Sequence, residues 1–104
     1  MTYKLFIDDL RDPVTDDWVV ARSSEQAIEV VRNRGLPVEI AFDHDLGGDD
    51  TTMKFINWLP DYFASRVDWS FPKDFKYTIH SQNPVGAANI RCAMENLIWF
   101  CGRV

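Results

Sequence analysis

Four short apolar runs interrupt an otherwise polar chain, and most of them end in polar residues. They cover residues 3–8, 18–22, 38–42 and 75–79. Runs of this length, rich in β-branched and aromatic side chains, are typical of buried strands. The pattern therefore predicts four strands. The stretch between the first two, residues 10–17, contains Asp12-Pro13 and is expected to be a loop.

Apolar residues recur at helical spacing after the second strand, over the segment that contains Ala27, Ile28, Val30 and Val31. Ser23 or Ser24 can cap the start of this helix, and Gln26 stands three residues after Ser23, as in a capping box. Gly35 is expected to end it.

Two more helices are predicted after the third and fourth strands. One begins near Thr51 or Thr52, and Pro60 is expected to kink or end it. The other begins at Asn83-Pro84, an Asn cap followed by proline at the first helical position, where no amide hydrogen is needed.

The element order after the first loop alternates strand and helix, as a parallel sheet requires. We therefore expect an α/β protein with a truncated flavodoxin-like three-layer fold. Its four parallel strands would lie in the order 2-1-3-4, flanked by three helices. If loop 10–17 replaces the first helix of such a fold, the switch point falls between strands one and three. Ligands bind outside the carboxyl ends of the strands at that point.

Composition limits the classes of protein. A chain of 104 residues that is 46% hydrophobic suits one core, so residues 1–104 are expected to form a single domain. No run approaches the roughly 20 apolar residues of a membrane span, and no signal peptide is recognisable, which predicts a cytoplasmic protein without a membrane partner. The net charge of -5 argues against an extended nucleic-acid-binding face.

The two cysteines, Cys92 and Cys101, lie nine positions apart in the last predicted helix. At about 100° per residue they occupy opposite faces, so they can form neither a mutual disulfide nor one side of a zinc site. We expect buried free thiols. Nothing in the composition indicates the oligomeric state.

Acidic residues concentrate where the strands end. Of the sixteen acidic residues, nine lie in two short segments, 8–17 and 43–50, and all nine are Asp. Converging carboxylates repel one another unless a cation compensates them, and hard divalent cations prefer oxygen ligands. Asp8, Asp9, Asp43 and Asp45 are therefore candidate ligands of Mg²⁺ or Mn²⁺. The alternative is structural, with the first pair capping a turn and the second holding the Gly47-Gly48 loop.

The second acidic segment also requires comparison with a calcium-binding EF-hand loop. Asp43, Asp45 and Gly48 occupy its first, third and sixth positions. The twelfth position, which needs a bidentate Glu, is Lys54, and the fifth is Gly47. The EF-hand interpretation is rejected.

Both histidines, His44 and His80, stand at strand ends and are expected at the same edge of the sheet. If Asp43-His44-Asp45 is extended, His44 points away from the two carboxylates and is available as a general base or acid. Ser81 and Asn83 add polar groups ahead of a helix N-terminus, which favours an anion such as a phosphoryl group.

Among the cations near the predicted site, Arg11 is the better candidate for a phosphate clamp. For Arg22, at the end of the second strand, a surface ion pair with one of the many aspartates is the simpler expectation.

Three segments resemble the signature of the cyclic-phosphate processing receiver domains. They are Leu-Phe-Ile-Asp-Asp-Leu-Arg at 5–11, Asp-His-Asp-Leu-Gly at 43–47, and His-Ser-Gln-Asn-Pro-Val-Gly at 80–86 with Ala-Ala-Asn at 87–89. The resemblance covers nearly the whole chain. It implies a receiver-like fold that acts on a small phosphorylated or cyclic-phosphate ligand. By position, the four aspartates would be the metal site, His44 and His80 the catalytic pair, and Asn83 with Asn89 polar support.

Two functions from different classes follow. The first is a metal-dependent phosphoesterase that processes a cyclic phosphate of nucleotide or RNA-end type. The second is a non-catalytic receiver-like module that binds a metal, a nucleotide or a protein partner. A phosphoaccepting receiver of two-component signalling would use Asp43 as acceptor, but it also needs a Lys at the end of a fifth strand, which this sequence does not offer.

Overall fold

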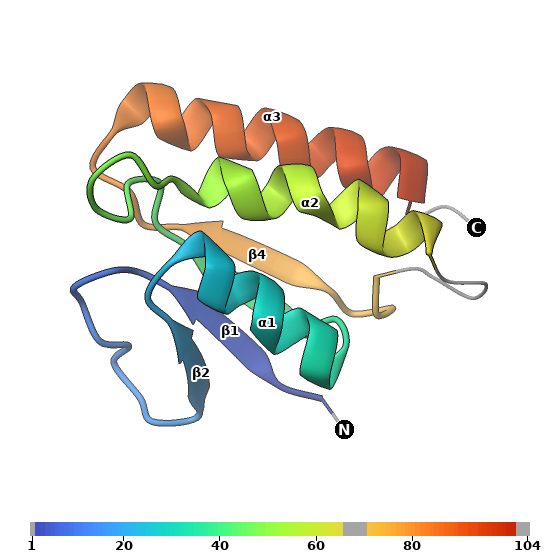
Figure 1. Ribbon diagram of the computed structural model, residues 1–104. Coiled ribbons are helices and arrows are strands. Elements are labelled where there is room, and N and C mark those ends of the chain that lie inside the picture. Colours follow the sequence, from blue (N-terminus) through green and yellow to red (C-terminus); the bar gives the residue numbers. More distant parts are fainter. Residues whose placement is uncertain (1, 66–70, 102–104) are drawn as a thin grey trace.

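A computed structural model describes residues 2–65 and 71–101 (Figure 1). Four strands and three helices follow one another in the predicted order. They are β1 (Lys4–Ile7), β2 (Trp18–Ala21), α1 (Ser24–Arg34), β3 (Glu39–Phe42), α2 (Thr52–Ala64), β4 (Lys76–Ile79) and α3 (Pro84–Cys101). Each strand lies within one residue of the bounds that the apolar pattern predicts, because these residues supply the buried face of the sheet.

The four strands form one sheet in the order β2-β1-β3-β4, and every neighbouring pair is parallel, as predicted. The register aligns Ile7 of β1 with Ala21 of β2 and with Phe42 of β3, and Phe42 with Ile79 of β4. All four strands therefore end at the same edge of the sheet. The residues that follow them in sequence meet there, at the switch point between β1 and β3.

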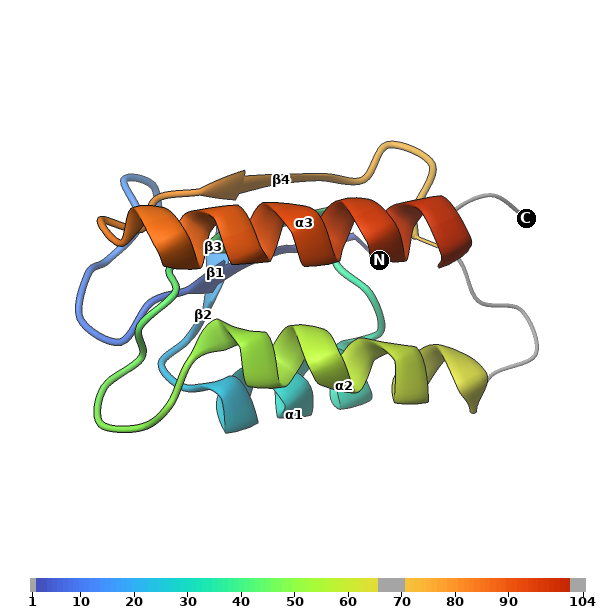
Figure 2. The same cartoon turned by 90° about the horizontal axis from the view of Figure 1, so that it is seen from above.

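The helices cover one face of this sheet. Leu5, Ile7, Ile40 and Phe42 point to that face and have no exposed surface; they belong to the same core cluster as residues from all three helices. Tyr77, the register partner of Ile40, donates a hydrogen bond of 2.6 Å to Glu95 on α3, which places α3 on the same side as α1 and α2. Figure 2 shows α1 and α2 together below the strands.

The expectation of three layers is therefore wrong for the described residues, which form two: one sheet and one layer of helices. The physical reason lies in residues 10–17. Asp and Pro dominate this stretch, so it forms an irregular loop where a three-layer fold needs a helix against the opposite face.

Helix boundaries follow local side-chain chemistry. Ser23 caps α1, because its Oγ accepts a hydrogen bond from the Gln26 amide at 3.1 Å, as predicted. The Gln26 side chain reaches the amide of Arg22 rather than that of the cap residue, so the reciprocal half of a capping box is shifted by one residue. Pro60 does not end α2, which continues to Ala64.

Two smaller expectations fail. Cys92 is exposed rather than buried, and the side chain of Cys101 lies outside the described part. The sequence at 68–74, with Trp69, Phe71 and Pro72, also predicts a connecting loop on the surface, but Phe71 is buried in the core, and Trp69 lies outside the described residues. None of the helices in the described part of the chain is long and apolar enough to cross a membrane.

Candidate functional site

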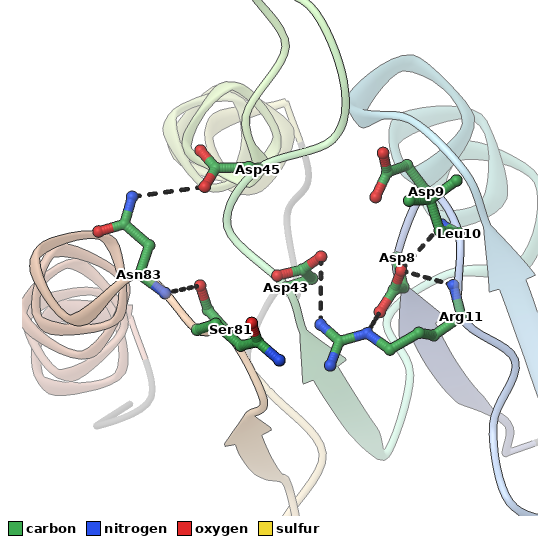
Figure 3. A pocket seen from close by; sticks show the side chains of 9 residues that line it. Asp8, Asp9, Leu10, Arg11, Asp43, Asp45, Ser81 and Asn83 are labelled. Atoms are coloured by element: carbon green, nitrogen blue, oxygen red, sulfur yellow. Dashed lines mark hydrogen bonds and ion pairs between the residues drawn. The ribbon is translucent and has the colours of Figure 1, made fainter.

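A pocket of about 460 Å³ opens at the carboxyl edge of the sheet (Figure 3). Its walls come from the segments that follow β1, β3 and β4. They contribute Asp8, Asp9, Leu10, Arg11, Asp43, Asp45, Ser81, Gln82 and Asn83. The parallel register thus brings together seven of the ten residues that sequence reasoning selected. His44, His80 and Asn89 are not among the lining residues.

Asp8 is the most deeply buried acid of the pocket, with 1% of its surface exposed. Its Oδ1 accepts hydrogen bonds of 2.9 Å from the amides of Leu10 and Arg11, and its Oδ2 lies 2.9 Å from Arg11 Nε and 3.0 Å from His80 Nε2. Burial raises the pKa of this carboxyl, but the hydrogen bonds from Arg11, Leu10 and His80, together with the Arg11 charge, hold the pKa below its usual value. Asp8 is therefore ionised at neutral pH.

Asp43 has the opposite electrostatic character. Burial and the neighbouring negative charge of Asp8 raise the pKa of its carboxyl, although the His44 amide and Arg11 oppose this effect. Its Oδ1 accepts from His44 N at 2.9 Å, and its Oδ2 lies 3.5 Å from Arg11 Nη2. The charge of one arginine compensates the two facing carboxylates only in part. This wall is therefore a favourable place for a further cation.

Asp9 completes a group of three. Carboxylate oxygens of Asp8, Asp9 and Asp43 lie within 4.8 Å of one another. Oxygens bound at about 2.1 Å to one octahedral ion lie about 3 to 4.2 Å apart, so a small contraction would let all three reach Mg²⁺ or Mn²⁺. Gly47, at φ 92°, passes the Asp9 carboxylate so closely that a β-carbon there would lie 3.4 Å from its Oδ2. The residues present therefore fit a hard divalent ion.

Asp45 stands apart from these three carboxylates. It is exposed, lies 3.0 Å from His44 Nδ1, and accepts a hydrogen bond of 3.4 Å from the Asn83 side-chain amide. These hydrogen bonds lower the pKa of the Asp45 carboxyl. The predicted cluster of four aspartates is thus a group of three with Asp45 on the facing wall. The separation arises because β3 ends at Phe42, and residues 43–45 leave the strand conformation.

His44 does not point away from both carboxylates, because the alternation of an extended strand does not continue past Phe42. Its ring meets Asp45 on one side and packs against Gly86 of α3 on the other; a β-carbon at Gly86 would lie 2.4 Å from His44 Cγ. A glycine at this helix position is what admits the ring.

His80 lies on the other side of the pocket, stacked on Phe6 with ring centroids 4.9 Å apart and planes at 8°. Its Nε2 contacts Asp8 at 3.0 Å. Each histidine therefore contacts an aspartate that lines the pocket, while its own ring does not line it. His80 contacts Asp8, and His44 contacts Asp45.

Arg22, expected from the sequence to form only a surface ion pair, makes further contacts near the pocket. It does pair with Asp12, but its Nη1 also donates to the carbonyl oxygens of Asp8 at 3.2 Å and Arg11 at 2.6 Å. Arg22 thereby ties down the loop that carries Asp8 and Arg11. The available signal was its position at the end of β2, next to the end of β1.

The N-terminus of α3 is already capped by its own chain. Asn83 Oδ1 accepts from Gly86 N at 3.0 Å and Asn83 O from Ala87 N at 2.8 Å, as the predicted cap requires. Ser81 Oγ accepts from Asn83 N at 3.0 Å. These bonds occupy amides that the predicted anion subsite would use, and Ser81 and Asn83 face the pocket with their side chains instead. Asn89 is exposed farther along α3.

A parallel sheet in the order 2-1-3-4, with acidic residues after β1 and β3 at its switch point, defines a receiver-like α/β domain. The family model for the cyclic-phosphate processing receiver domain matches residues 3–96, and the chain belongs to that family. This confirms the resemblance found in the three motifs. Comparison with curated proteins and with solved structures finds no significant match.

Proposed function

We propose that the pocket holds a divalent cation, Mg²⁺ or Mn²⁺, and that the domain uses it to bind a cyclic phosphate and open the ring by hydrolysis. The observation that carries the proposal is the convergence of Asp8, Asp9 and Asp43 within 4.8 Å, two of which share the guanidinium of Arg11. The family to which the chain belongs supplies the class of ligand. In the reaction, water adds across one P–O ester bond, and the released oxygen leaves as a hydroxyl.

A divalent cation, when bound, would screen the phosphate charge and supply Lewis-acid activation. Asp8, Asp9 and Asp43 would be its ligands. The chain's own contribution begins with Arg11, whose guanidinium contacts Asp8 and Asp43 while 47% of its side chain stays exposed. From that position Arg11 can turn toward a phosphate oxygen that enters the pocket, because its fork of donors matches two phosphate oxygens.

The two His–Asp pairs are the groups that would carry out general acid–base catalysis. His80 Nε2 and Asp8 Oδ2 are 3.0 Å apart, as are His44 Nδ1 and Asp45 Oδ1. Asp45 lines the pocket on the wall opposite Asp8, where it can accept a proton from an attacking water while His44 holds the carboxylate in place. Under this proposal the histidines position the pocket aspartates rather than touch the phosphate directly.

The second candidate, a domain that binds a cyclic phosphate without cleaving it, is favoured by one observation. Neither histidine ring lines the pocket, so the direct acid–base pair that sequence reasoning assigned to His44 and His80 would need both rings to move. The two candidates share the metal and the ligand class, and they differ only in turnover.

The test is incubation of the purified protein with Mg²⁺ or Mn²⁺ and nucleoside 2′,3′-, nucleoside 3′,5′- or ribose 1″,2″-cyclic phosphates, followed by ³¹P NMR. We expect conversion of at least one substrate to a phosphomonoester, complete inhibition by chelator, and loss of conversion in Asp9→Asn. Asp16→Asn makes the same change in charge on an exposed residue outside the pocket and should react like the wild type.

Cyclic phosphate that binds only with metal but is recovered unchanged would select the non-catalytic candidate. Binding that survives chelator, or the absence of both binding and turnover with every substrate, would contradict the proposed function.

A further inference from the structure

The face of the sheet without helices carries a second cavity. Its floor is the outward row of the sheet, where Phe6 of β1, Ala41 of β3 and Thr78 of β4 are register partners, and Trp18 of β2 stands beside them. Pro13 and Val14 of the loop 10–17 form its wall. The groove measures about 390 Å³, which is within the range of small-ligand sites.

The groove is largely aromatic and apolar. Phe6 stacks on His80 and meets Trp18 edge to face at a centroid distance of 5.9 Å and an angle of 71°. Val14 in the wall is fully exposed. Exposed apolar side chains over an aromatic floor indicate a ligand with a flat apolar face, since such a ligand gains most from covering them.

The groove adjoins the acidic pocket at Arg11, which lines both. The guanidinium of Arg11 contacts Asp8 and Asp43 in the pocket. His80 closes the end of the groove and contacts the same Asp8 carboxylate. A ligand whose charged group lies among the carboxylates would therefore extend over the exposed side of Arg11 into the groove.

We propose that this groove binds the nucleobase of a nucleoside cyclic phosphate whose phosphate lies in the acidic pocket. The inference rests on the proposed function and adds the substrate class to it. A nucleobase is planar, and every base can stack on aromatic side chains. Phe6 and Trp18 offer such side chains in the groove. The Thr78 hydroxyl offers one donor and acceptor to the edge of the base.

The first experiment compares two ligands in Mg²⁺ by calorimetry: adenosine 2′,3′-cyclic phosphate and methyl ribofuranoside 2′,3′-cyclic phosphate, which lacks the base. We expect the base to tighten binding about tenfold or more. Thr78→Phe fills the groove and should abolish this advantage while leaving the affinity for the base-free ligand unchanged.

Lys76→Phe is the matched control. Lys76 points to the same face from the same strand, two residues away, and does not line the groove. It should keep the full advantage of the base. Equal affinity of the wild type for both ligands, or an unchanged advantage in Thr78→Phe, would overturn the inference while the proposed function stands on the base-free ligand.

A second measurement isolates the groove from the phosphate site. Adenosine without phosphate is titrated into ¹⁵N-labelled protein with Mg²⁺, and the amides of Ala41 and Thr78 and the Trp18 indole N–H are followed. We expect these signals to shift together in the wild type and in Asp9→Asn, but not in Thr78→Phe.

Unshifted groove signals in the wild type overturn the inference. Shifts with adenosine combined with no binding of either cyclic phosphate would overturn the proposed function and, with it, this inference. A concentration-dependent dimer that Thr78→Phe dissociates would also overturn it, because a second copy of the chain would then cover the groove.

Discussion

The two walls of the acidic pocket are built from the same residue type but differ in their electrostatics. On one wall, Asp8 and Asp43 are buried, crowd together with Asp9, and share a single arginine. On the other, Asp45 is exposed and fully engaged with His44 and Asn83. On the first wall three carboxylates share the charge of Arg11, whereas the single carboxylate of the second wall already has two hydrogen-bond partners.

This difference separates carboxylates whose charge is only partly compensated from one that the fold already stabilises. Burial and Asp8 raise the pKa of the Asp43 carboxyl, which means that ionisation there costs free energy that a cation would recover. Hydrogen bonds lower the pKa of Asp45, so its ionised form is already stabilised by the fold. Asp45 accepts a hydrogen bond from Asn83 at the N-terminus of α3, whereas the carboxylates of Asp8 and Asp43 on the opposite wall share Arg11. Proximity at a strand end alone does not distinguish these roles.

The largest expected effect is a difference in metal affinity between variants of the two walls. Asp9→Asn should weaken Mn²⁺ binding by about 100-fold or more, because a direct ligand matters more than the outer partners that typically cost 10- to 100-fold. Asp45→Asn should change the affinity by less than about threefold, since it removes no ligand. Calorimetric titration measures both. Equal losses of Mn²⁺ affinity in the two variants would indicate that Asp45 is also a metal ligand.

Arg11→Gln removes the arginine that contacts both Asp8 and Asp43. The metal-free protein should lose about 2 kcal/mol of unfolding free energy, because hydrogen bonds to charged groups contribute about 1.5–3 kcal/mol. Arg32→Gln, which removes an exposed pair with Glu29 and a cation–π contact of 5.6 Å with Trp58, should cost less, about 0.5–1 kcal/mol. Urea unfolding measures both, and saturating Mn²⁺ should restore most of the Arg11 loss. A loss that metal does not restore would show that Arg11 acts only as a structural tie.

Gly86→Ala tests the wall that carries Asp45, because the His44 ring that contacts Asp45 packs against Gly86. Alanine normally stabilises a helix interior by about 1 kcal/mol over glycine, but overpacking a filled site costs about 1–3 kcal/mol. Because a β-carbon would lie 2.4 Å from the His44 ring, we expect a net loss of about 1 kcal/mol. In a His44→Ala background the same change should stabilise the protein. Thermal unfolding of the four proteins in this cycle gives the coupling, and additive effects would contradict the contact.

Asp43→Asn has an expected effect of similar size and opposite sign. A raised carboxyl pKa in the folded state means that stability falls as pH rises through the folded pKa. Removing the charge should therefore stabilise the metal-free protein by about 1 kcal/mol at pH 7, which raises Tm by about 4–8 °C. The gain should vanish at pH 3, where both states are protonated.

Asp8→Asn is the comparison for that measurement. The pKa of Asp8 is lowered in the folded state, so its contribution is present at neutral pH and is lost as pH falls through the folded pKa. Asp8→Asn should destabilise the protein at pH 7. If both variants shifted Tm in the same direction, the electrostatic contrast between these two neighbours would be wrong.

Local patterns in the sequence were sufficient for the elements and their order. Four apolar runs predicted the strands within a residue, and Ser23 and Asn83 marked two helix starts. Alternation of strand and helix predicted a parallel sheet whose ends place Asp8, Asp9 and Asp43 at one edge. Such inferences succeed because capping, strand burial and parallel connections depend on neighbours in sequence or on simple topological rules.

Tertiary structure alone decided which contacts those residues make. His80 meets Asp8 across 72 positions of sequence, and His44 is turned toward Asp45 by its contact with Gly86. Side-chain directions beyond a strand end obey packing rather than alternation, so the separation of Asp45 from the other three aspartates could not be read from spacing. The open face of the sheet likewise depends on where three helices pack. The sequence by itself thus determined which acids gather at the edge, and long-range packing determined which of them lie within 4.8 Å of one another.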